Sequence, residues 1–160
     1  MAVLAVLLST RSVCLSNQQQ EQKATPAQLA SSETLTLCTA LIVWSVDHPP
    51  EGEYFDENSA SSIDLTVSKR LNTAAVEKMV VPTYLDKLPS RDPWGHLYDF
   101  LKNTDRKQPW TWAVRSPGPD GHFCSESYLR QKPDWDKCDD IVRVDGVLVA
   151  GPVPASEEQK

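Results

Sequence analysis

The sequence lacks the short motifs that mark common catalytic and metal sites. It contains no Cys-x-x-Cys pair, and the histidines His48, His96 and His122 are isolated from one another. A zinc site is therefore not predicted, because such sites draw on closely spaced cysteines and histidines. Gly-x-Ser-x-Gly, His-Glu-x-x-His and a glycine-rich phosphate loop after a strand are missing as well. We predict that the protein is not an enzyme. A small hydrolase, the alternative, would need a pocket that unites His96 or His122 with acids.

Clustered positive charge and long apolar runs are also missing. The net charge is −6, and lysines and arginines are scattered singly among acids, which argues against a nucleic-acid partner. The apolar run within residues 1–16 is shorter than the roughly 20 residues that cross a bilayer, so no transmembrane span is predicted. Residues 1–16 are similar to the end of a secretory signal peptide, although the positively charged start is absent. An ordinary amphipathic segment is the alternative.

Glycine is half as frequent as proline, with six glycines against twelve prolines in 160 residues. This balance favours one loop-rich domain with fixed turns over a helical bundle. We place the globular domain at residues 25–150. A polar linker at residues 17–24 precedes it, and a disordered tail at residues 151–160 follows it.

A first helix is predicted to begin at Thr25, with Thr25 as N-cap and Pro26 in the first helical position. His48-Pro49-Pro50 ends it. Apolar residues recur along it at helical spacing and predict one buried stripe: Leu37, Ala40, Leu41 and Trp44. Cys38, beside this stripe, is expected to be a small buried hydrophobe.

The remaining elements follow from weaker patterns. A second helical pattern covers residues 64–80 and stops at Pro82. We expect the first sheet strand at Leu97–Leu101 and another at Trp110–Val114, which ends at Ser116. The strongest hairpin indication is Asp145-Gly146, between Ile141–Val144 and Val147–Val149.

Three segments carry a resemblance to a known family. Asp92-Pro93-Trp94-Gly95 lies within Leu88–Phe100 and is typical of a turn that leads into a strand. A Pro/Gly loop, Ser116–Gly121, and two acids before a β-branched run, Asp139–Ile141, follow in this order. The order resembles the globular domain of the major pseudopilin of bacterial type II secretion, over about residues 35–142. The matching positions are Leu88, Pro89, Asp92, Pro93, Trp94, Gly95, Tyr98, Ser116, Gly118, Asp120 and Gly121.

The resemblance implies a fold and a metal. The fold is α+β and type IV pilin-like, with an N-terminal helix packed on a small antiparallel sheet and a C-terminal acidic loop. Asp120 and Asp140 match the family's calcium-binding carboxylates, Asp139 is an additional candidate ligand, and carbonyls near Ser116 and Gly118 are further candidates. A solvated acidic loop without Ca²⁺ is the alternative.

The resemblance also implies a role. It predicts a non-catalytic structural protein of the bacterial cell envelope, exported to the periplasm or cell surface. Its partners would be other protein subunits, with self-assembly into a secretion pseudopilus or a related filament. The family's basic leader, Gly-Phe cleavage site and long apolar helix are not found in this sequence. Either a longer reading frame supplies them, or the fold serves another assembly.

Cys124 and Cys138 flank much of the acidic loop. A disulfide between them would suit an oxidising envelope compartment and, by loop entropy, would contribute about 3 kcal/mol. Two unpaired thiols are the alternative, since sequence alone does not establish the pairing.

The tryptophans support an alternative function. Trp110 and Trp112 are two residues apart, so on a strand they would share one face. With Trp135 they would form the aromatic surface of a secreted module that binds carbohydrate or peptide. Packing of the sheet on the first helix is the interpretation that we favour for the first two.

Overall fold

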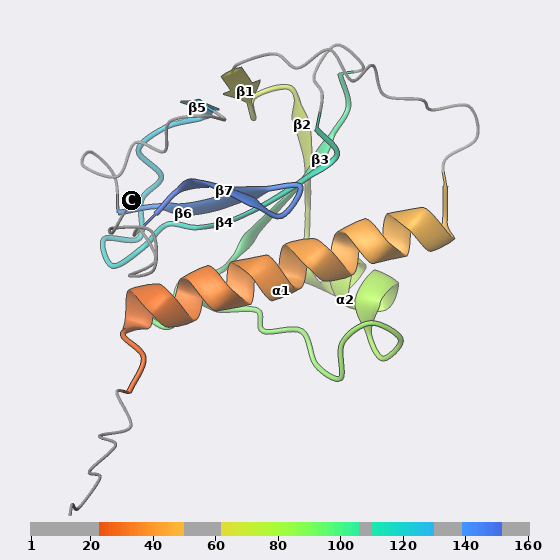
Figure 1. The fold of residues 1–160 in the computed structure, drawn as a ribbon, viewed down its shortest axis with the longest axis horizontal. Helices are drawn as coiled ribbons and strands as arrows, with labels where there is room; N and C mark the ends of the chain where they lie inside the picture. Colours follow the sequence, from red (N-terminus) through yellow and green to blue (C-terminus); the bar gives the residue numbers. More distant parts are fainter. Residues whose placement is uncertain (1–22, 50–61, 106–109, 130–138, 152–160) are drawn as a thin grey trace, which may run out of the picture.

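The computed structural model describes residues 23–49, 62–105, 110–129 and 139–151 (Figure 1). In these residues a long N-terminal helix packs on antiparallel strands, which confirms the predicted α+β class. The elements are α1 (Pro26–Asp47), β1 (Ser62–Asp64), β2 (Ser68–Leu71), α2 (Thr73–Val80), β3 (Asp99–Asn103), β4 (Trp112–Ser116), β5 (Ser127–Leu129), β6 (Ile141–Val144) and β7 (Val147–Ala150).

Helix α1 begins and ends where the sequence predicts. Thr25 is the N-cap, Pro26 opens the helix, and Thr25 and Gln28 exchange the two hydrogen bonds of a capping box. Asp47 is the last helical residue and His48 the C-cap. Leu37, Ala40 and Leu41 of the predicted stripe are buried. Cys38 is fully buried, as expected, and is a free cysteine.

The length of α1 has a second implication. Its 22 residues are long and apolar enough to cross a membrane, whereas the sequence predicted no such span. Length and composition alone do not assign a membrane, because helices in the core of soluble proteins meet the same test. In the described part of the chain one face of α1 packs on the sheet.

The predicted helix at residues 64–80 is only partly correct. Helix α2 covers Thr73–Val80, with Asn72 as N-cap, and Val81-Pro82 follows it. The preceding residues form β1 and β2 instead. β2 pairs along its length with β3, so tertiary pairing outweighs the weak helical spacing of Leu65 and Leu71.

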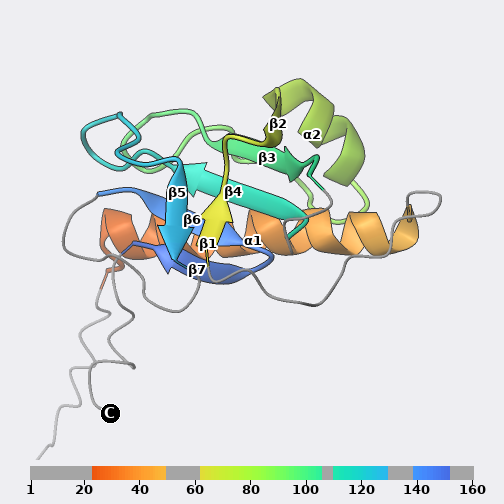
Figure 2. The ribbon, with the colours of Figure 1, turned by 90° about the horizontal axis from the view of Figure 1, so that it is seen from above.

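Two layers of strands lie on α1. The five-stranded sheet has the order β2-β3-β4-β6-β7, and β1 pairs with β5 in a separate two-stranded sheet; all these pairs are antiparallel. The small sheet lies on the side of the large sheet that faces away from α1 (Figures 1 and 2). β4 is at the centre, and all five of its residues are buried.

The strand predicted at Leu97–Leu101 as the first of the sheet is β3, the third strand along the chain. β1 and β2 precede it, and it begins at Asp99 rather than Leu97. Leu97 instead forms an isolated bridge with Arg91, which closes the turn before β3. The hairpin at Asp145-Gly146 is confirmed. Both turn residues have positive φ, +47° and +82°, as a type I′ turn requires.

Trp110 and Trp112 do not share a face, so that prediction is wrong. β4 begins at Trp112, which packs with Leu37 and Leu41 of α1. Trp110 lies before the strand and packs with Ile63 and Leu101 in the core between the two sheets. Both rings are buried, at 1% and 0% exposure, so neither offers an aromatic surface to a carbohydrate. Trp135 lies outside the described residues.

Candidate functional site

The turn at Asp92–Gly95 and the Ser116–Gly121 loop are joined through one buried carboxylate. Oδ1 of Asp92 accepts hydrogen bonds from the backbone N–H groups of Trp94 (3.1 Å) and His96 (2.8 Å). Oδ2 accepts one from the Ser116 hydroxyl at 2.6 Å. Because the Ser116 oxygen in turn accepts from Gly118 N at 3.1 Å, the carboxylate fixes both loops at once.

The imidazole of His96 makes the second contact between these loops. Its Nδ1 lies 2.8 Å from the carbonyl oxygen of Gly118. A Cβ at Gly121 would lie only 2.9 Å from the His96 Nε2, and φ there is +75°, so both space and backbone favour glycine.

Gly118 brings in the third segment. Its φ is +69°, and a Cβ there would lie 2.2 Å from the carbonyl oxygen of Asp139. Only glycine allows so close a backbone approach. The three segments that carry the family resemblance therefore meet in one place, which we call the loop joint: Asp92–His96, Ser116–Gly121 and Asp139–Asp140.

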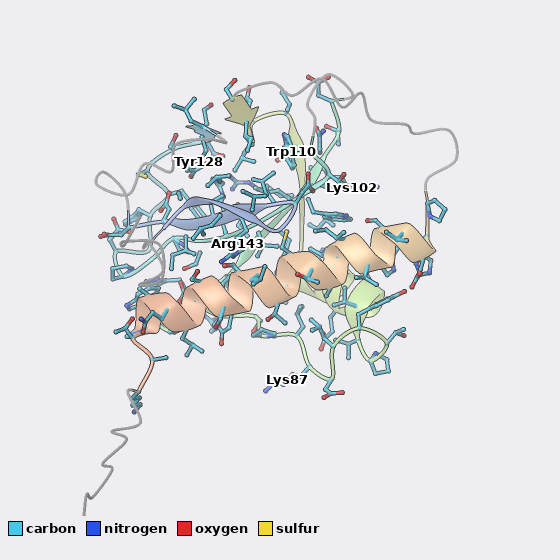
Figure 3. The ribbon with its side chains drawn as sticks, viewed as in Figure 1. Lys87, Lys102, Trp110, Tyr128 and Arg143 are labelled. Carbon is cyan, nitrogen blue, oxygen red and sulfur yellow. The ribbon has the colours of Figure 1, made fainter. Side chains whose placement is uncertain are left out.

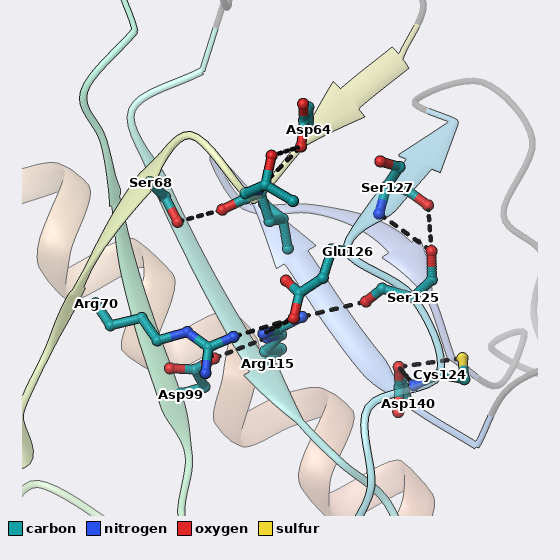
Figure 4. Close-up of polar contacts among 12 residues, drawn as sticks. Asp64, Ser68, Arg70, Asp99, Arg115, Cys124, Ser125, Glu126, Ser127 and Asp140 are labelled. Atoms are coloured by element: carbon teal, nitrogen blue, oxygen red, sulfur yellow. Dashed lines mark hydrogen bonds and ion pairs between the residues drawn. The ribbon is translucent and has the colours of Figure 1, made fainter.

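Asp140 is the buried acid of the loop joint. Its Oδ2 accepts a hydrogen bond from Cys124 N at 3.1 Å (Figure 4). The same oxygen accepts a second hydrogen bond from the Tyr128 hydroxyl at 3.2 Å. Burial raises the pKa of Asp140 and outweighs these two hydrogen bonds and the charge of Arg115, which all lower it. The charge of Asp120 adds a smaller effect in the same direction as burial. Two carboxylates therefore repel each other in this region.

The other predicted metal ligands have different surroundings. Asp120 and Asp139 are exposed, and Asp120 accepts a hydrogen bond from His122 N at 2.9 Å. Ser116 pairs with Ile141 in the sheet. Among the described residues, no group of three histidines, cysteines or acids is arranged to hold a metal ion. The oxygen donors here are of the type that Ca²⁺ takes, which also accepts carbonyls and water.

Cys124 lies directly beside Asp140. Its Sγ is 3.3 Å from Oδ2 of that acid, and Cys124 is disulfide-bonded. Cys138, the predicted partner, lies outside the described residues, so the pairing stays a prediction.

A buried arginine, which the sequence analysis missed, anchors the same loop to the sheet. Arg115 of β4 is fully buried; it donates to Asp99 Oδ2 (2.9 Å), Glu126 Oε1 (3.0 Å) and the Ser125 carbonyl (3.2 Å). Burial lowers the pKa of the guanidinium, but the hydrogen bonds to Glu126 and Asp99 offset this and leave it raised. The Phe123 ring lies 3.8 Å from the guanidinium carbon. The alternation of the strand gave no indication of a charge in the core.

Fold and site together define an α+β protein with an N-terminal helix on antiparallel sheets and a joint of three loops beside a buried acid. No protein-family model, curated protein or solved structure matches the chain.

Proposed function

We propose that the protein is a non-catalytic, pseudopilin-like structural subunit of the bacterial cell envelope. One observation carries this proposal. The three segments of the resemblance are each separated by just under twenty residues in sequence. They meet in the loop joint through Asp92–Ser116, His96–Gly118 and Gly118–Asp139. Residues that match a family pattern and also contact one another in the structure are better evidence for the resemblance than the pattern alone.

Calcium would order the acidic side of the loop joint. In this proposal Asp120 and Asp140 bind Ca²⁺, with Asp139 and carbonyls near Ser116 and Gly118 as further ligands. The support is electrostatic, because burial disfavours an ionised Asp140 by more than Arg115 favours it, and the charge of Asp120 adds to the effect of burial. A divalent cation would reverse both effects by compensating the two charges.

The surface of α1 supports assembly with other subunits. Four large hydrophobic residues of α1 are exposed, namely Leu29, Leu35, Val43 and Val46. The only charged residues within the helix are Glu33 and Asp47. An apolar helix face of this kind suits contacts with further protein copies. Export to the periplasm or cell surface accords with the disulfide at Cys124.

A thermal melt of the full chain, with millimolar calcium and then with chelator, tests the proposal. Calcium at a hundredfold excess over its dissociation constant should stabilise the fold by about 2.7 kcal/mol. Asp120→Ala and Asp140→Asn should abolish this increase, whereas Asp86→Ala, an exposed acid in another loop, should preserve it. No increase in the unsubstituted protein, or an equal increase in all variants, would exclude calcium at these acids.

A further inference from the structure

A cavity lies at the C-terminal end of α1, remote from the loop joint. Its volume is about 590 Å³, within the usual range of small-molecule sites. Ile42 and Val46 of α1 supply apolar walls, and Trp44 and Trp112 supply aromatic ones. The rings of Trp44 and Trp112 meet edge to face at 6.4 Å between centroids.

Lys102 is the cation in the wall of this cavity. Its ammonium lies 5.8 Å from the centroid of the Trp112 ring, in a cation–π contact. Lys69 stands directly opposite Lys102 in the β2–β3 pair, so both side chains project from the same side of the sheet. Two like charges at paired positions destabilise a sheet, and an anion between them would relieve the repulsion.

Asp145 is the acid in the wall, and its oxygens are engaged by the backbone. Asp145 accepts hydrogen bonds from the backbone N–H groups of Thr111 (3.0 Å) and Trp112 (2.9 Å). Ser45 accepts from the indole N–H of Trp112. The cavity therefore combines an apolar, aromatic interior with the ammonium of Lys102 and with one carboxylate, Asp145, that accepts hydrogen bonds from the backbone of Thr111 and Trp112.

We propose that this cavity binds a small organic anion with an apolar or aromatic body and one carboxylate. The body would lie against Trp44, Ile42 and Val46, with the buried Trp112 ring behind Trp44, and the carboxylate would pair with the ammonium of Lys102. Trp44 also stacks on His48, with 4.7 Å between centroids, which holds its ring in place along the wall. The proposal is independent of the calcium site, since none of the proposed calcium ligands lines the cavity. Of the four exposed apolar residues of α1, Val46 lines the cavity, whereas Leu29, Leu35 and Val43 do not.

Three ligands of one shape and different charge test the proposal: 4-phenylbutyrate, 4-phenylbutan-1-ol and 4-phenylbutylamine. Each is titrated into the ¹⁵N-labelled full chain, and the indole N–H signals of Trp112 and Trp110 are followed. Trp110 is an internal control, because it lies in the core on the other side of the sheet. We expect saturable shifts at Trp112 and not at Trp110, with roughly fivefold tighter binding of the anion than of the alcohol and weaker binding of the amine.

Two lysine variants separate a specific ion pair from general attraction. Lys102→Gln should reduce the affinity for the anion to that of the alcohol. Lys87→Gln should leave it unchanged, because Lys87 is exposed on a loop below α1, whereas Lys102 lies above the helix (Figure 3). Val46→Trp, at a position that is 72% exposed, should fill the cavity entrance without disturbing the core and should weaken all three ligands. Equal affinities for the three ligands, shifts at Trp110 alone, or retained anion preference in Lys102→Gln would overturn the proposal.

Discussion

The hydroxyl of Ser116 donates one hydrogen bond to Asp92 and accepts another from Gly118, so one residue at the end of β4 positions two loops. Arg115, the residue before it, holds a third loop through Glu126 and Ser125. Buried polar groups with satisfied hydrogen bonds fix one arrangement, since losing one partner leaves the other desolvated. The polar residues of β4 thus determine where the loops lie.

Cys38 gives a prediction at the residue scale. Burial raises the pKa of its thiol to about 11. A raised folded-state pKa means that the unfolded chain loses its proton first, so stability falls as pH rises from the ordinary thiol value near 9 toward 11. At pH 10 this loss amounts to roughly 1 kcal/mol.

Urea unfolding of the unsubstituted protein and of Cys38→Ala at pH 8 and pH 10 measures this effect. The alanine variant has a cavity cost at both pH values but no thiol to ionise, so the two proteins should differ less at pH 10 than at pH 8. A difference that does not change with pH would show that Cys38 does not ionise on unfolding in this range.

Helix α1 is the element with two different surfaces. One surface is buried on the sheet, and Arg143 of β6 fixes it further through hydrogen bonds to the carbonyl and hydroxyl of Ser31. On the other surface Leu35 and Val43, beside Tyr84, line a shallow apolar groove. A helix whose exposed face is this apolar is expected to have a partner.

Charge placed on that surface should therefore weaken assembly. If α1 contacts other copies, Val43→Glu should shift the full chain toward monomer in sedimentation velocity. Each buried apolar side chain of this size contributes roughly 1–3 kcal/mol to an interface. Val147→Glu, at an equally exposed valine in the β6–β7 hairpin, is the matched control and should sediment like the unsubstituted protein. Identical sedimentation of both variants and the parent would remove α1 from the assembly surface.

At the scale of the whole molecule, the sequence predicted those elements whose conformation depends on neighbouring residues in the chain, such as caps and tight turns. The cap at Thr25 and the turn at Asp145-Gly146 are such cases. β2 was missed because Ser68–Leu71 becomes a strand only by pairing with β3, which lies about thirty residues further on. The separation of Trp110 from Trp112 depends on where β4 begins.

The candidate site was partly predictable for a related reason. Gly118 and Asp92 belong to turns with clear local indications, and the resemblance linked their segments by their order along the chain. The contacts between them depend on the packing of loops on β4, which no local spacing encodes. Arg115 was missed because a buried arginine is recognisable only from the acids that surround it, and these come from β3 and the loop before β5.

The central claim is that calcium orders the loop joint, and amide hydrogen exchange with and without calcium tests it most directly. The account predicts slower exchange in residues 117–124 and 139–142, by up to about a hundredfold at a hundredfold excess of calcium over its dissociation constant. Amides of α1 that exchange by local opening should not change. Uniform slowing along the chain, or none in the loop joint, would contradict the account.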